Sequence, residues 1–367
     1  MQAALFKSYF NDVLPRVAQY YPRQDTSRLL EMQKEFQKLF GVFFGIDITQ
    51  DLPVESFPTF EQVLGIIQLA IQRGETFVGF GQQNQSARLR YLEDSLGLLI
   101  SVVLDAKLRG GGRYHQQLVR KLAENGNEFR NTSFISLNYD IVLDNALSLV
   151  RDENPAQFDI DYTVDFTNFR HERLNRALQP WPIPDPSRAI KLVKPHGSLN
   201  WLYCSTCTNV TLTPGIKGVV KGILEPKRFD CPECGCKTTP IIVLPTFFKS
   251  MTNFHLQRVW RAAQEVLQTA DRIIFCGYSL PDADIHIRYL LKRGELNRSH
   301  LKAPPKVIIV NHHSRKKKED AKGEEKRFKS AFIHAEHVCY TRLSFQTFSN
   351  HGFAALDGLE IVSGAGR

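Results

Sequence analysis

Five of the seven cysteines lie close together in the sequence. Cys204 and Cys207 form one Cys-x-x-Cys pair, and Cys231 and Cys234 form a second pair after 23 intervening residues. Two such pairs can hold four thiolates around one zinc ion at about 2.3 Å and leave no open coordination position. The spacing therefore predicts a structural zinc site. Cys236 is an alternative fourth ligand with poorer knuckle spacing, and free or redox-active thiols are the alternative use of the cluster.

A histidine lies between an apolar run and the first cysteine pair, in the sequence Lys194-Pro195-His196-Gly197-Ser198. Histidine titrates near neutral pH, which makes His196 a candidate general base. A structural histidine beside a glycine is the commoner case, so its assignment depends on the motifs around it. As a residue at the end of a strand, His196 is expected to face a crevice and to contribute little to packing.

Polar residues follow three other apolar runs. They are Asn138-Tyr139-Asp140, Gly277-Tyr278-Ser279 and Asn311. Ligands bind beyond the carboxyl ends of the strands in open parallel sheets, so we expect these segments and His196 to line one crevice. The alternative for Asn138 and Asp140 is an Asx turn that caps the following helix.

The elements that would position these residues alternate between strand and helix. Apolar runs predict strands at 133–137, 190–194, 241–244, 272–276 and 307–310, and helical spacing predicts helices at 141–150, 254–270 and 283–292. This alternation predicts an α/β fold with a Rossmann-like, mostly parallel sheet covered by helices on both faces. Four prolines between 180 and 186 predict that 155–186 crosses the surface in extended form.

The first third of the chain has a different pattern, because its apolar residues recur at helical spacing. Thr59 is the expected N-cap of one helix, and a second helix should cover 89–108 and end at the glycines 110–112. We therefore expect a helical region at 1–130, a Rossmann-like core at 131–200 and 241–345, a zinc module at 201–240 and a C-terminal tail at 346–367.

The composition, 43% hydrophobic and 23% charged, is that of a globular protein. No apolar run reaches the roughly 20 residues that span a bilayer, and no signal peptide is evident, so we expect a cytoplasmic protein without membrane contact, in which clustered cysteines favour metal over disulfides. The net charge of +9 is concentrated in 315–318 and 326–329, between acidic residues. A solvated surface of mixed charge is the first interpretation, and direct nucleic-acid binding is the alternative.

Together and in this order, the motifs resemble the sirtuin superfamily, and more closely its prokaryotic SIR2-like branch, over about residues 130–345. The resemblance implies NAD as substrate or co-substrate and structural Zn²⁺ at the four cysteines. It implies that His196 of the His-Gly motif is catalytic and that Asn138 and Asp140 line the nicotinamide-ribose pocket. It further implies a set of cofactor-binding residues at the ends of the later strands: Gly277, Ser279, Asp284 and Asn311.

The chain differs from that family in two respects. The family opens with a strand and a Gly-Ala-Gly loop that binds the NAD pyrophosphate, and neither 77–81 nor 364–366 has the setting of such a loop. Leu137 stands where sirtuin deacylases commonly carry Gln. We therefore expect weak NAD binding by residues 1–367, and a strand with a Gly-rich turn if the coding region is extended upstream. Lys191 and Lys194 are the residues that would compensate for the missing loop.

The resemblance implies three candidate functions. The first is an NAD glycohydrolase of the prokaryotic anti-phage type, in which His196 is the general base, Asn138 orients the ribose or water, and Asp140 holds the motif or supports the developing charge. The helical N-terminal region and Leu137 favour this function. The alternatives are an NAD-dependent protein deacylase and a catalytically silent scaffold for a nucleic-acid-handling partner, either an ATPase or an Argonaute-type protein. Assembly into a homo-oligomer is compatible with each.

Overall fold

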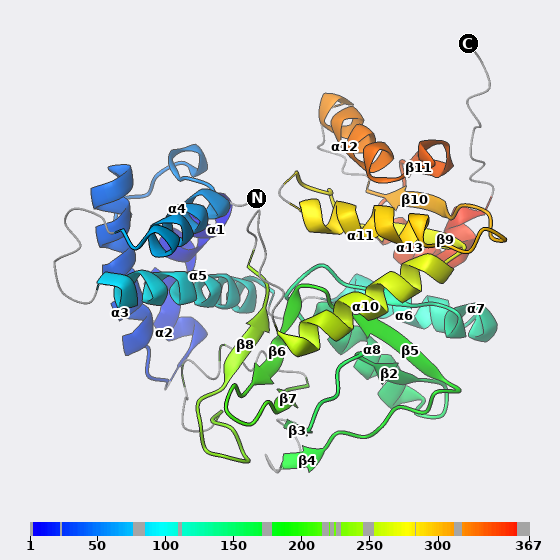
Figure 1. Cartoon of the computed structure of the whole chain (residues 1–367), viewed down its shortest axis with the longest axis horizontal. Helices are drawn as coiled ribbons and strands as arrows, with labels where there is room; N and C mark the ends of the chain where they lie inside the picture. Colours follow the sequence, from blue (N-terminus) through cyan, green and yellow to red (C-terminus); the bar gives the residue numbers. More distant parts are fainter. Residues whose placement is uncertain are drawn as a thin grey trace.

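The computed structural model describes residues 3–22, 24–75, 85–108, 112–170, 178–214, 220, 224, 229–244, 253–282, 284–311 and 318–357. Several segments considered above fall outside these residues, namely 77–81, 110–111, 283, 315–317 and 364–366. Figure 1 shows helices α1–α5 grouped on one side of the molecule and the strands on the other.

The helices have the following bounds: α1 Ala3–Lys7, α2 Val17–Tyr20, α3 Ser27–Leu39, α4 Phe60–Arg73, α5 Gln85–Lys107, α6 Arg113–Ala123, α7 Gly126–Arg130, α8 Val142–Glu153, α10 Phe254–Thr269, α11 Ile285–Leu296, α12 Lys318–Ala331 and α13 Phe345–His351. Short π or 3₁₀ segments lie at Ser8–Val13, Leu14–Arg16, Phe40–Phe44, Val54–Ser56, Ala335–His337 and Gly352–Leu356. None of the described helices is both long and apolar enough to cross a bilayer.

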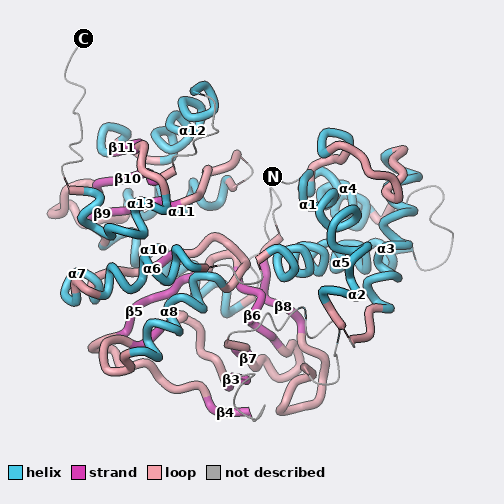
Figure 2. The backbone as a smooth tube through the Cα atoms, turned by 180° about the vertical axis from the view of Figure 1, so that it is seen from behind, coloured by secondary structure: helices cyan, strands magenta, loops and turns pink. Residues whose placement is uncertain are grey.

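The strands are β1 Phe134–Ile135, β2 Asp159–Asp161, β3 Asn168–Arg170, β4 Leu178–Pro180, β5 Ala189–Val193, β6 Gly197–Tyr203, β7 Val210–Leu212, β8 Thr239–Ile242, β9 Arg272–Cys276, β10 Lys306–Val310 and β11 Val338–Thr341. They form two three-stranded parallel sheets, in the orders β1-β5-β2 and β11-β10-β9, and one five-stranded mixed sheet in the order β4-β3-β7-β6-β8. The tube in Figure 2 shows the same separation between the α1–α5 group and the strands from behind.

The helices α1–α5 surround their own apolar core, which is rich in aromatic rings from residues such as Phe6, Phe36 and Phe60. Thr59 caps α4 as predicted: its Oγ1 accepts from the Gln62 N–H at 3.2 Å, and Gln62 Oε1 accepts from the Thr59 N–H at 2.8 Å. This reciprocal pair satisfies two N–H groups that the helix leaves open. The predicted helical character of the N-terminal region is therefore confirmed.

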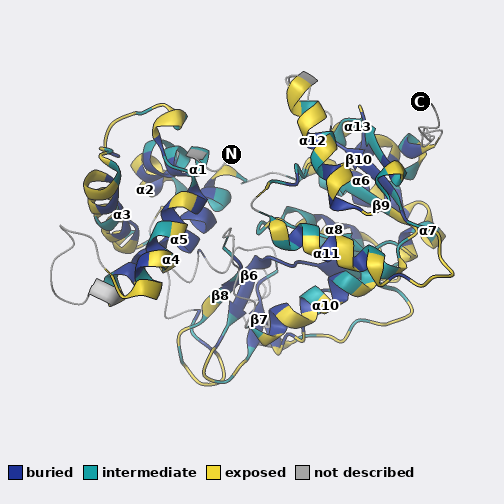
Figure 3. Ribbon diagram, turned by 45° about the horizontal axis from the view of Figure 1, so that its top comes forward, coloured by how far each residue is buried: buried dark blue, intermediate teal, exposed yellow. Residues whose placement is uncertain are grey.

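Helices α6 and α7 also fall within 1–130, but they pack in the second core together with the parallel sheets. Helix α13 lies against α6, and Gly352 just beyond it approaches the Lys121 side chain. Figure 3, coloured by burial, shows buried and exposed residues alternating along the helices around the strands. Residues 346–357 are thus part of the folded core rather than a free extension.

The predicted parallel pairing is confirmed, but the parallel strands lie in two sheets rather than one. Among the described strands, β1 pairs only with β5, and β9 pairs only with β10. Strand β2 lies within the segment predicted to cross the surface in extended form. The prediction of an extended surface segment was therefore incomplete. Alternate residues of β2 and its flanks, Phe158, Ile160 and Tyr162, pack in the core, and β2 pairs in parallel with β5.

The prediction that 241–244 is a strand of the parallel core was wrong, because β8 pairs antiparallel with β6. Every residue of β6 except Tyr203 is buried. Trp201 of β6 packs in the core of the parallel sheets, whereas Leu199 and Leu202 pack in the core of α1–α5. The five-stranded sheet therefore joins the two cores, and the cysteine segment lies at the far end of β6 from His196.

Candidate functional site

The His-Gly turn connects β5 of the parallel sheet to β6 of the mixed sheet. Gly197 has φ +77°, and a Cβ at this position would lie 1.8 Å from the carbonyl oxygen of Ile241. Only glycine allows β8 to approach this closely. The turn is held by two backbone bonds, from Gly197 N–H to Lys194 O and from Val243 N–H to His196 O, both 2.9 Å. Gly197 and these two backbone hydrogen bonds therefore determine where His196 lies.

The His196 imidazole is buried, with 4% exposure, and both of its ring nitrogens have hydrogen-bond partners. It is therefore not open to a crevice in the way the sequence suggested. Its Nδ1 lies 2.9 Å from Leu137 O. A carbonyl oxygen can only accept, so Nδ1 carries the proton and Nε2 of the neutral ring carries a lone pair. That lone pair faces His286 Nε2 at 2.7 Å, so His286 is the donor.

Two further side chains extend this contact along the 277–286 segment. Asp284 Oδ1 lies 3.8 Å from His286 Nε2, and Asp284 Oδ2 accepts a hydrogen bond from the Tyr278 hydroxyl at 2.6 Å. Burial, together with the charge of Asp284, raises the pKa of Tyr278 well above its ordinary value. The phenol therefore remains a neutral donor that orients the carboxylate.

The Asn138-Tyr139-Asp140 motif lies beside His196. Asn138 is exposed, whereas Asp140 Oδ1 accepts from the Val142 N–H at 2.9 Å in an Asx turn at the start of α8. The Tyr139 ring lies 6.0 Å from the His196 ring, and its hydroxyl donates to Val243 O at 2.5 Å. The motif therefore positions the loop through Tyr139 and Asp140 and leaves Asn138 open to solvent.

A buried ion pair lies beneath this loop. Lys194 has no exposed surface, and its Nζ donates to Asp140 O at 2.6 Å and to Asp144 Oδ2 at 2.8 Å. The other carboxylate oxygen of Asp144 accepts from Asn200 Nδ2 at 3.2 Å. The suggestion that Lys194 could compensate for a missing phosphate loop was wrong, because its charge is already paired inside the protein.

The remaining predicted cofactor residues lie at the ends of β9 and β10. Gly277 is exposed and has φ +69°. Asn311 is buried, and its Nδ2 donates to Tyr278 O at 2.6 Å and to Glu324 Oε1 at 2.5 Å. Its Oδ1 is buried and has no hydrogen-bond donor among the described residues. The Ser279 carbonyl accepts from Arg327 Nε at 3.3 Å. These contacts tie the strand ends together.

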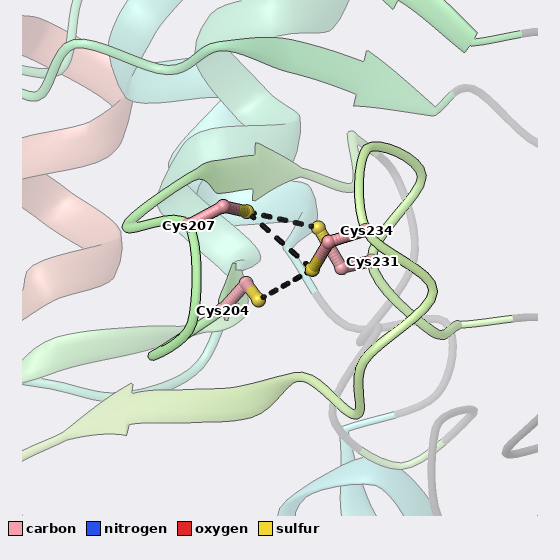
Figure 4. Close-up of side chains that lie close together, drawn as sticks. All are labelled: Cys204, Cys207, Cys231 and Cys234. Carbon is pink, nitrogen blue, oxygen red and sulfur yellow. Dashed lines mark hydrogen bonds between the residues drawn. The ribbon is translucent and has the colours of Figure 1, made fainter.

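The four predicted cysteines converge, as Figure 4 shows. Their Sγ atoms are separated by 3.5 Å between Cys204 and Cys234, by 3.4 Å between Cys207 and Cys231 and by 3.7 Å between Cys207 and Cys234. Four thiolates at about 2.3 Å from one zinc ion would be about 3.8 Å apart, so the observed spacing fits a tetrahedral zinc site. Cys236 is not one of the four converging residues.

Each cysteine pair is followed by a residue in the left-handed region, which turns the backbone back toward the ligands. These residues are Thr208, with φ +61°, and Gly235, with φ +70°. A left-handed β-branched residue costs about 1–3 kcal/mol, which the surrounding structure must offset. Burial raises the pKa of Cys204, but hydrogen bonds from the N–H groups of Cys207 and Thr206 and from the thiols of Cys234 and Cys207 outweigh it and bring the pKa to about 6. Such a thiol readily supplies the thiolate that zinc binds.

The cysteine cluster is separate from the histidine site. Cys204 directly follows β6 and His196 directly precedes it, and a seven-residue strand is about 23 Å long. A zinc ion in this cluster would have a closed shell of four sulfurs and would hold the β6–β7 hairpin against the segment leading to β8. Such an ion would therefore have a structural role.

Sequence reasoning missed the chemistry of His286 and Tyr278. Both lie in the segment around the predicted Gly277, Ser279 and Asp284, but their link to His196 spans 90 residues. The only local signal was an Asp-x-His sequence, Asp284 and His286, at the start of a predicted helix. Such a sequence does not indicate that the His286 side chain will contact His196 at the end of another strand.

Comparison with known proteins identifies the fold family. No curated protein matches the chain. Solved structures that resemble it include Sir2 with a p53 peptide and NAD⁺, at 13% identity and a TM-score of 0.37, covering 79% of this chain and 89% of that one. Another is Sir2 with an inhibitor, 2′-O-acetyl-ADP-ribose and a deacetylated p53 peptide, at 14% identity and a TM-score of 0.32, covering 68% and 76%. The sequence model of the SIR2-like domain matches residues 132–335, which is more than half of the chain. The protein therefore belongs to the SIR2-like domain family.

Proposed function

We propose that this protein is an NAD glycohydrolase, which cleaves the bond between nicotinamide and ribose. The observation that carries the proposal is the tautomer of His196. The Leu137 carbonyl holds the proton on Nδ1 and leaves a lone pair on Nε2. A neutral imidazole with a fixed orientation at the end of a strand has the properties of a general base that works near neutral pH.

The reaction asks little of the protein beyond orientation and one base. Water oxygen forms a bond to the ribose C1′, the bond to the nicotinamide nitrogen breaks, and its electron pair leaves with the neutral pyridine. The proton of the attacking water passes to His196 Nε2. Because His286 donates to that atom in this structure, the substrate water must replace this hydrogen bond.

The neighbouring side chains support this role in different ways. Asn138, exposed beside the histidine loop, would orient the ribose or the water. Asp140 fixes the turn through Val142. Asn311 Oδ1, a buried acceptor without a donor among the described residues, would accept from a hydroxyl of the adenosine ribose. Gly277 and Ser279 would present backbone to the nucleotide, and Asp284 would orient the loop that carries His286.

Leu137 favours hydrolysis over deacylation. Its side chain packs against the core of the parallel sheets and offers no amide to the ribose, so the position supplies only its backbone carbonyl, to His196. The hydrogen bond from His286 to the lone pair of His196 Nε2 is the observation that favours a silent scaffold. Service in anti-phage defence belongs to the glycohydrolase proposal and rests on the family resemblance, and a homo-oligomer is compatible with it. An ATPase or Argonaute-type partner belongs to the scaffold alternative, and the cytoplasmic location is a proposal from the sequence.

The test is the release of free nicotinamide from NAD by the purified protein, with and without an acetyl-lysine peptide. Millimolar NAD is required because we expect weak binding. We expect peptide-independent release and a decrease of about 10²- to 10⁴-fold in His196→Ala. The matched control is His300→Ala, since His300 is exposed and follows α11 outside the site. Release only with peptide would show a deacylase, and no release in either condition would favour the scaffold.

A further inference from the structure

Three potential metal ligands meet where the His-Gly turn approaches the start of α11. The His196 and His286 Nε2 atoms are 2.7 Å apart, the Asp284 Oδ1 atom is 3.8 Å from His286 Nε2, and all three ligand atoms lie within 4.8 Å of one another. The three side chains are largely buried, and their ligand atoms converge on one point. We propose that His196, Asp284 and His286 form a second metal site, which binds a divalent transition metal such as Zn²⁺.

The outer contacts of two of these ligands, His196 and Asp284, are those of a metal site. A metal-binding histidine commonly donates its other ring N–H to a carbonyl or carboxylate, and a metal-binding carboxylate is itself hydrogen-bonded. His196 Nδ1 donates to Leu137 O at 2.9 Å, which leaves Nε2 as the ligand atom. Asp284 Oδ2 accepts from the Tyr278 hydroxyl at 2.6 Å, which leaves Oδ1 as the ligand atom.

The carboxylate of Asp284 does not cap the helix that it precedes, α11. Asp284 occupies the N-cap position of α11, where an aspartate commonly accepts from the helix N–H groups, yet its side chain makes no capping hydrogen bond. It contacts Tyr278 and faces His286 instead. A hydrogen bond between His196 and His286 does not require this carboxylate, whereas a three-ligand metal site does.

To hold a metal ion, the site must release the proton that His286 Nε2 donates to His196, and the ligand atoms around His286 must shift slightly. Zinc-bound nitrogens at about 2.0–2.1 Å in tetrahedral geometry are about 3.3 Å apart, so the two Nε2 atoms must separate by about 0.6 Å. The Asp284 oxygen must approach His286 by a similar amount. Two imidazoles and one carboxylate leave the fourth position open, in contrast to the closed shell of the four-cysteine site.

Metal binding would act on the proposed reaction through His196. A metal bound to Nε2 takes the lone pair that the proposed function assigns to the general base, so a loaded site would not accept a proton from water. This consequence rests on the proposed function, whereas the metal site itself does not. We therefore expect added Zn²⁺ to slow nicotinamide release and a chelator to restore it.

The experiment starts from protein of residues 1–367 whose four-cysteine site is filled with zinc. Added Co²⁺ should produce the visible absorption of cobalt bound to nitrogen and oxygen, without the charge-transfer band of cobalt thiolates. Equilibrium dialysis with Zn²⁺ should show a second equivalent per chain. His286→Gln and Asp284→Asn should remove or strongly weaken this second equivalent, and Tyr278→Phe should weaken it by about 10- to 100-fold because it removes an outer contact. His300→Gln is the matched control and should bind as the wild type does.

Two results would overturn the proposal. One is wild-type protein that takes up no second equivalent of zinc and shows only cobalt–thiolate bands. The other is folded His286→Gln protein that binds the second equivalent as tightly as the wild type. The wild-type cobalt spectrum decides the question even if the variants fail to fold. Absence of NAD hydrolysis, in contrast, would contradict the proposed function and leave the metal measurement intact.

Discussion

The buried ion pair beneath the loop at 138–140 offers a quantitative test of how this loop is held. Lys194 is fully buried and contacts both the Asp140 carbonyl and the Asp144 carboxylate. Lys194→Met retains the apolar stem and removes the charge. The Asp144 carboxylate, which is 2% exposed, is then left in the core with only neutral donors, from Asn200 and the Tyr162 hydroxyl.

The expected cost is large because the remaining charge cannot reach water. Removing one partner of a buried ion pair destabilises a protein by about 3–5 kcal/mol. At about 2.1 cal/mol/K per residue for the 367 residues, this corresponds to a decrease in Tm of about 4–6 °C if the chain unfolds as one unit. Lys191→Met on the same strand is the control, and it should change stability by less than about 0.5 kcal/mol because Lys191 is half-buried.

Urea unfolding followed by circular dichroism measures these differences, and a double variant identifies their cause. Lys194→Met combined with Asp144→Asn removes both charges and retains the shape of the Asp144 side chain. If the uncompensated carboxylate causes the loss, the double variant is more stable than Lys194→Met alone. A Lys194→Met protein as stable as Lys191→Met, or two losses that simply add, would refute the reasoning.

Four further predictions follow from the described contacts. The four-cysteine site should retain close to one zinc per chain after weakly bound metal is removed, and Cys231→Ser should lower solubility or Tm; a folded, metal-free preparation would contradict this. Gly197→Ala should unfold or precipitate the protein because its Cβ would meet Ile241 O at 1.8 Å, whereas Gly45→Ala, with similar φ and nothing within 4 Å, should cost about 1–2 kcal/mol; equal Tm values would disprove the clash. Burial lowers the pKa of His115 from its ordinary value of 6.5, so the folded protein favours the neutral ring. The neutral ring's contribution to stability is therefore complete above pH 6.5 and is lost as pH falls through the lowered pKa. Urea midpoints between about pH 8 and about pH 5 should therefore fall less in His115→Gln than in the wild type, and parallel curves would argue against it. Calorimetric titration of NAD into residues 1–367 should show weak binding, and low-micromolar affinity would show that another element holds the phosphates.

The sequence by itself determined the features that depend on local spacing. Two Cys-x-x-Cys pairs specify a metal knuckle because each pair brings its thiolates together within one turn of backbone. The same holds for the Thr59 capping box, since both of its partners lie within four residues. The strands β1, β5, β8, β9 and β10 and the helices α8, α10 and α11 were recognisable because apolar periodicity records which face of each element is buried.

Only the tertiary structure decided which strand ends meet and what each polar group contacts. The pairing of β8 with β6 depends on the close approach allowed at Gly197, and the burial of Lys194 depends on Asp144, 50 residues away. The tautomer of His196 depends on a carbonyl oxygen at Leu137, and the neighbour of its lone pair comes from α11. These contacts join segments that are distant in sequence, and their geometry is set by how the sheets and helices pack rather than by any local pattern.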